Sequence, residues 1–90
     1  MAVKSFLKDP AAVLDYQLNW SAWLDGDTIS TSTWSAETGI TVDSESETTS
    51  AATVWLSSGS PGEDYEVTNQ IVTDGGRTDE RTITIKVRQR

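Results

Sequence analysis

The 90-residue chain contains no cysteine and no histidine. These absences exclude disulfide bonds, thiolate chemistry, a Cys/His zinc site and an imidazole general base. Basic residues are also scarce: 7 lysines and arginines stand against 14 acidic residues, giving a net charge of -7 at pH 7. Nucleic-acid binding normally needs a basic face, so this charge argues against a nucleic-acid partner.

Long apolar runs are missing as well. Apolar residues make up 36% of the chain, and no run approaches the roughly 20 residues that a membrane span needs. The opening MAVKSFLKDP lacks the apolar core of a secretory signal. Ninety residues suffice for a single small domain, and we expect no membrane partner.

Enzyme chemistry finds little support in the sequence. Serine and threonine have no imidazole partner. The chain is also too short to build the cleft in which a glycosidase holds a sugar between two carboxylates. Asp25 and Asp27 flank Gly26 like a fragment of a calcium loop, but the twelve-residue ligand spacing is missing. A solvated turn is the alternative reading of this segment. We therefore expect a protein without enzymatic activity and without a cofactor.

Charge is segregated along the chain. Residues 9–76 contain no lysine or arginine but hold twelve acidic residues. The basic residues all lie outside this stretch: Lys4, Lys8, Arg77, Arg81, Lys86, Arg88 and Arg90. If the two ends meet in the fold, the molecule is dipolar and can attract a basic partner or pack head to tail. The alternative is that the charge only keeps a thin-cored domain soluble.

Apolar residues alternate with polar ones, which is typical of half-buried strands. In residues 13–20, Leu14, Tyr16, Leu18 and Trp20 share one face. Residues 43–50 have no apolar side chain and predict an exposed loop or a weak edge strand. The other predicted strands are residues 28–35, 40–42, 52–57, 65–73 and 78–88. This pattern predicts an all-β protein: an antiparallel immunoglobulin- or fibronectin-III-like β-sandwich of six or seven strands at residues 13–90, after an N-terminal arm at residues 1–12.

Tyr65 supports the immunoglobulin-like prediction. It follows a loop that contains Gly59, Pro61 and Gly62, and it begins an alternating strand. This layout is typical of a tyrosine corner, in which the phenol bonds to the backbone of the preceding segment. An ordinary core tyrosine is the alternative.

The chain has four tryptophans, and aromatic side chains are enriched at protein interfaces. We expect Trp20 and Trp34 in the core, Trp55 on an outward face and Trp23 in a loop. A sugar site on an exposed tryptophan is a further option. The predicted interface residues are Phe6, Leu7, Trp23, Trp55, Lys86 and Arg88, and the predicted structural residues are Trp20 and Tyr65.

Five segments carry a resemblance to a known family: residues 6–10, 12–16, 55–59, 65–69 and 76–85. They resemble small accessory virion proteins of tailed bacteriophages, some described as fibre–tail adaptors or neck components. The resemblance implies a protein made in the bacterial cytoplasm and built into the virion. It also implies docking to other neck, tail or fibre proteins, in a ring or another multi-copy assembly.

Two other functions stay open. One is decoration of the capsid surface, with adhesion to host glycans. The other is an acidic, non-structural regulator that binds a host or phage protein.

Overall fold

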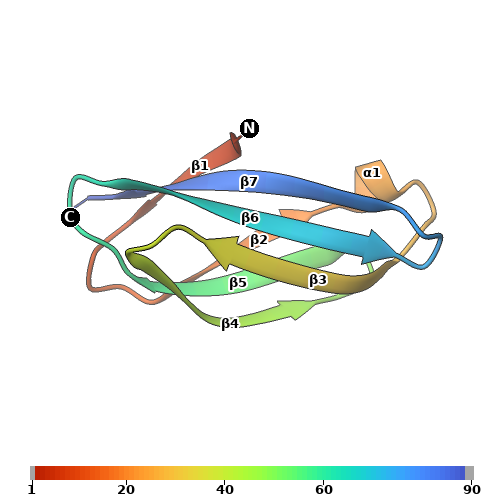
Figure 1. Ribbon diagram of the computed structural model, residues 1–90, viewed down its shortest axis with the longest axis horizontal. Coiled ribbons are helices and arrows are strands. Elements are labelled where there is room, and N and C mark those ends of the chain that lie inside the picture. The colour runs from red at the N-terminus through yellow and green to blue at the C-terminus, as the bar shows by residue number, and fades with distance from the viewer. Residues whose placement is uncertain (1, 89–90) are drawn as a thin grey trace.

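The computed structural model describes residues 2–88, with side chains from residue 5 onward. Within them the chain forms two sheets and one short helix (Figure 1). The elements are β1 (Ala2–Lys8), β2 (Leu14–Asn19), α1 (Ser21–Leu24), β3 (Ile29–Ala36), β4 (Ile40–Glu47), β5 (Ala51–Ser58), β6 (Asp64–Thr73) and β7 (Thr78–Val87). One sheet has the order β1-β7-β6-β3 and the other β2-β5-β4. The predicted all-β sandwich is confirmed.

The core lies between the inward faces of the two sheets. The alternation along β2, β5, β6 and β7 places apolar side chains there, because successive residues of a strand point to opposite faces. The buried apolar residues are Tyr16, Leu18, Trp20, Leu24, Ile29, Trp34, Ile40, Ala52, Val54, Leu56, Tyr65, Val67, Ile71, Ile83, Ile85 and Val87. The result is an elongated body, 41 × 22 × 20 Å.

The last two strands, both predicted from alternation, pair with each other. β6 and β7 form an antiparallel hairpin from Asp64 opposite Lys86 to Val72 opposite Thr78. The immunoglobulin-like assignment stays a prediction. It is supported by the grouping of β2, β4 and β5 in one sheet and β3, β6 and β7 in the other.

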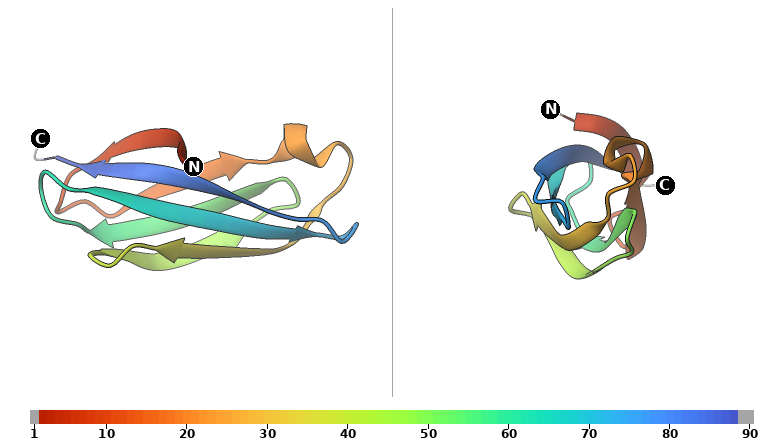
Figure 2. Two further views of the ribbon diagram at one scale, coloured as in Figure 1. Left: turned by 45° about the horizontal axis from the view of Figure 1, so that its top comes forward. Right: turned by 90° about the vertical axis from the view of Figure 1, so that its right-hand side faces the viewer.

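The expected N-terminal arm is not free in the described residues. Residues 2–8 form β1, which pairs in parallel with β7, with Ser5 opposite Thr84 and Lys8 opposite Val87 (Figure 2). The strand ends before Pro10, so the missing proline N–H does not interrupt the ladder. Pairing also covers an edge of β7 that would otherwise expose unpaired backbone groups. Met1 lies outside the described residues.

Three further features differ from the simple alternation. Residues 21–24 form one helical turn, α1, where the sequence predicted a loop around Trp23. Residues 40–47 form β4, an exposed edge strand, one of the two outcomes expected for its acidic part.

In β3, Ile29 and Trp34 are both buried although alternation places them on opposite faces. A register shift between Ile29 and Thr31 explains this, because it inserts one extra residue.

Candidate docking surfaces

The described residues enclose no pocket and contain no group of three or more acidic side chains able to hold a metal ion. No helix among them has the length and apolar character needed to cross a bilayer. What the described residues can offer a partner is therefore their side-chain clusters and their outer faces.

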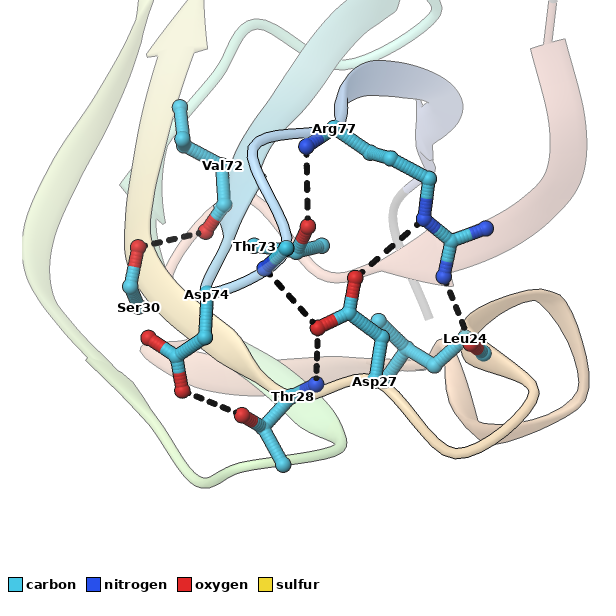
Figure 3. A network of polar contacts seen from close by, with 9 residues as sticks. Leu24, Asp27, Thr28, Ser30, Val72, Thr73, Asp74 and Arg77 are labelled. Carbon is cyan, nitrogen blue, oxygen red and sulfur yellow. Dashed lines mark hydrogen bonds and ion pairs between the residues drawn. The ribbon is translucent and has the colours of Figure 1, made fainter.

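Asp27, a candidate calcium ligand in the sequence, joins the loop after α1 to the β6–β7 hairpin (Figure 3). Its carboxylate accepts hydrogen bonds from the backbone N–H groups of Thr28, at 2.8 Å, and Gly75, at 3.1 Å. It also accepts one from Nε of Arg77 at 3.2 Å. Hydrogen bonds from the Thr73 hydroxyl, these two N–H groups and the guanidinium lower the pKa of Asp27 to about 2.

Two arginines of the β6–β7 hairpin cover two tryptophans near α1. The Arg77 guanidinium lies 4.4 Å from the centroid of the Trp23 ring, and that of Arg81 lies 4.1 Å from Trp20. Both distances are within the range of cation–π attraction. Trp23, which the sequence predicted as an interface residue, is thus half-buried and already covered. Trp20 is fully buried, as its alternation predicted.

Trp55 is on the outer face of the β2-β5-β4 sheet and is 41% exposed. The ladder places it between Asp15 of β2 and Ser44 of β4. Val13, just before β2, is 52% exposed. We call the exposed positions Val13, Asp15 and Trp55 the Trp55 face. It presents a large aromatic group beside a carboxylate on the solvent-exposed side of the sheet.

The remaining interface candidates lie around β1 and β7. Leu7 is 54% exposed and pairs with Lys86, which is half-buried. Phe6 instead packs against the core, with its ring 5.0 Å from that of Tyr16. Arg88 is engaged in an ion pair of 3.0 Å with Asp64. Of the six candidates, Leu7 and Trp55 are the ones that present large exposed apolar surface.

Tyr65 makes the contact expected of a tyrosine corner. The backbone N–H of Ser60, in the preceding loop, donates to its hydroxyl at 2.9 Å. The ring also lies against Gly39, where a Cβ would come within 2.8 Å of Tyr65 Cε1. Tyr65 therefore ties two loops at one end of the sandwich to β6.

Lys8 was not predicted as a site residue, yet it is fully buried. Its ammonium donates to the carbonyl oxygens of Ser58, at 2.7 Å, and Asp9, at 2.9 Å. Burial lowers the pKa of Lys8, while the charges of Asp9 and Asp43 act in the opposite direction. Lys8 follows Phe6 by two residues in β1, so it shares the face that Phe6 turns to the core, and the apolar Leu7 between them takes the outer face.

Comparison with known proteins gives one family match. The model of a family described as podophage GP4 fiber-tail adaptor protein gp77 matches residues 8–86. The matched range runs from the last residue of β1 nearly to the end of β7. No curated protein matches the chain.

Proposed function

The chain belongs to the podophage fibre–tail adaptor family, and from this membership we propose that it is a non-enzymatic structural protein of the virion. In this proposal it joins a tail or neck component to a fibre component through protein–protein contacts. It is synthesised in the host cytoplasm and is incorporated into the particle in several copies. A two-sheet sandwich suits this role because its backbone is fixed by ladders on both sheets and can hold two surfaces at a set separation.

The family match over residues 8–86 carries the proposal, and the two sheets support it because each presents a large exposed apolar side chain. Leu7 projects from β1 of one sheet, and Trp55 projects from β5 of the other. An adaptor has to contact two partners at once, so it needs two separate docking surfaces. Exposed aromatic and aliphatic groups supply the contact area that anchors such interfaces.

The experiment measures incorporation of Leu7→Ser and Trp55→Ser variants into phage particles by quantitative mass spectrometry. Gln70→Ser, an exposed position on β6, is the matched control. We expect both apolar variants to lower the copy number per particle while their melting temperatures stay close to that of the wild type. The control should be incorporated normally.

Three results would contradict the proposal. Normal incorporation of both apolar variants would remove the two-surface role. A wild-type copy number matching that of the major capsid protein would favour decoration of the capsid. Absence of the protein from the particle would favour the acidic regulator instead.

A further inference from the structure

Two tryptophans of this molecule lie under an arginine side chain. In the cluster around α1, the Trp23 ring, the Arg77 guanidinium and the Asp27 carboxylate form a triad. The indole face attracts the cation, and the carboxylate accepts a hydrogen bond from it at 3.2 Å. The neighbouring Trp20 lies under Arg81 at 4.1 Å.

The Trp55 face has two parts of the same triad. Asp15 lies directly opposite Trp55 in the β2–β5 ladder, and directly opposed residues have Cβ atoms about 5 Å apart. Alternation puts both side chains on the outer face, and both residues are exposed. A cation above Trp55 would therefore be within reach of the Asp15 carboxylate. Among the described residues no arginine lies over Trp55, and the ion pairs are Arg77 with Asp27 and Arg88 with Asp64.

A second carboxylate borders this face. Ser57 follows Trp55 by two residues on the outer side of β5, and its hydroxyl donates to Oδ1 of Asp43 at 2.7 Å. The Asp43 charge acts on the Lys8 ammonium, which is buried and donates to two backbone carbonyls. The surface that a partner meets is thus an indole with carboxylates on both sides.

A second copy of this chain is a poor occupant. Of the described arginines, Arg77, Arg81 and Arg88 are engaged with Trp23, Trp20 and Asp64. Lys86 is half-buried within its sheet. Because each chain carries a net charge of -7, a second copy would bring mainly like charge to the face.

We propose that the Trp55 face binds an arginine side chain of a basic segment in a partner virion protein. The guanidinium stacks on the indole and donates hydrogen bonds to Asp15, completing the triad that Trp23, Arg77 and Asp27 form inside the chain. Val13 supplies apolar contact for the arginine methylenes. Arginine is favoured over lysine because its planar group can stack and bond to carboxylates simultaneously. This inference rests on the proposed adaptor function, since it names the chemistry of one of the two partners.

The first experiment follows nitrogen–proton correlation NMR spectra of the wild-type protein during titration with a tri-arginine peptide. We expect the largest shift changes at the Trp55 indole N–H and at the backbone amides around Asp15. Trp55→Leu and Asp15→Asn should each weaken binding by about two- to fivefold, which corresponds to an exposed cation–π or ion-pair contact. Tri-lysine should bind more weakly, and a tri-citrulline peptide, which lacks the charge, should leave the spectrum unchanged.

Two controls make the result specific. Glu47→Gln removes an exposed carboxylate from the other end of β4 and should bind tri-arginine like the wild type. Asp15→Arg supplies an internal guanidinium beside Trp55 and should abolish peptide binding. Equal chemical-shift changes at all acidic surfaces, or unchanged binding of tri-arginine by the Trp55→Leu variant, would overturn the inference.

A second readout separates this inference from the proposed function. Asp15→Asn and Asp15→Arg are compared with the wild type for incorporation into particles. Reduced incorporation together with weaker peptide binding supports the arginine contact. If Trp55→Ser is excluded from particles while Asp15→Asn and Asp15→Arg are incorporated normally, the adaptor function stands and the arginine contact is overturned. If all three are incorporated normally, the Trp55 face is not a docking surface in the virion.

Discussion

The indole N–H of Trp20 donates a 2.9 Å hydrogen bond to Oδ1 of Asn69, and both side chains are fully buried. Nδ2 of Asn69 in turn donates to the hydroxyl of Ser32, at 2.8 Å, and to the carbonyl of Thr33, at 3.2 Å. One asparagine therefore connects the residue that precedes α1 to two strands of the opposite sheet. A buried polar group is tolerated in this core because its hydrogen bonds are made.

Asn69→Leu should lower the free energy of unfolding by about 2–3 kcal/mol, because the buried Trp20 N–H loses its acceptor. Urea unfolding followed by tryptophan fluorescence measures this change, with an unchanged m-value indicating that the transition stays comparable. Gln70→Ala, at the neighbouring exposed position, should stay within about 0.5 kcal/mol of the wild type. Equal stability of the two variants would contradict the role assigned to the network.

Trp34 provides a contrast with Trp20. Its Nε1 is buried without a hydrogen-bond partner in the described residues. Trp34→Phe removes an indole N–H that makes no hydrogen bond, whereas Trp20→Phe leaves the side-chain Oδ1 of Asn69 without its donor. We expect Trp20→Phe to cost about 1–2 kcal/mol more than Trp34→Phe in the same urea assay. The reverse order would show that ring packing, rather than hydrogen bonding, dominates at these positions.

The parts of the fold that follow from period-2 alternation could be predicted from the sequence. Trp20, Tyr65 and Trp55 lie on the faces predicted for them, because in a regular strand successive residues point to opposite faces. Trp34 was predicted to lie in the core, but strict alternation along β3 puts its side chain on the other face of the strand from the buried Ile29. The bulge that resolves this conflict leaves no local signal in a segment rich in serine and threonine.

Contacts between distant segments could not be predicted in the same way. Two partners of Asp27, Gly75 and Arg77, lie 48 and 50 residues further along the chain. Arg77 also covers Trp23, so the ring of this predicted interface residue is occupied within the chain. The parallel pairing of β1 with β7 is another contact between distant segments that the sequence does not predict. It joins the two ends of the chain, and scattered apolar residues in a short segment do not indicate a partner strand.

Gly39→Ala should destabilise the protein more than Gly62→Ala. Both glycines have positive φ, +111° at Gly39 and +85° at Gly62, so an alanine is strained at either position. At Gly39 the new Cβ would also come within 2.8 Å of the Tyr65 ring, while Gly62 faces open space. We expect a loss of about 1 kcal/mol for Gly62→Ala and 1–3 kcal/mol beyond that for Gly39→Ala. Thermal unfolding of both variants tests this order, and equal losses would mean that Tyr65 moves away freely.

Lys8 should make stability depend on pH in the alkaline range. Its pKa in the folded state is lowered from the ordinary value of 10.5 by burial. Between the lowered folded-state pKa and 10.5 the unfolded chain binds more protons, so the free energy of unfolding rises with pH. Lys8→Met, which keeps the length of the side chain, should remove this rise. Urea unfolding of both proteins across the alkaline range measures the difference, and parallel pH profiles would contradict the burial of the ammonium.

Asp27 should contribute the opposite dependence at acidic pH. Its pKa is lowered from the ordinary value of 3.8 to about 2 in the folded protein, and the hydrogen bond with the Thr73 hydroxyl is the largest cause. Since the folded-state pKa is depressed, the stabilisation is fully present above the unfolded value and is lost as the pH falls from about 4 through about 2.

Asp27→Asn should therefore be less stable than the wild type at neutral pH, and the gap between the two proteins should close as the pH approaches 2. Thermal unfolding monitored by circular dichroism over this range measures the gap. Glu45→Gln, an exposed carboxylate on β4, serves as the control and should follow the wild-type profile. A gap that stays constant down to the lowest pH would mean that the Asp27 carboxylate does not need its charge. The hydrogen bond that the Gly75 N–H donates to residue 27, rather than the ion pair with Arg77, would then hold the hairpin to the loop after α1.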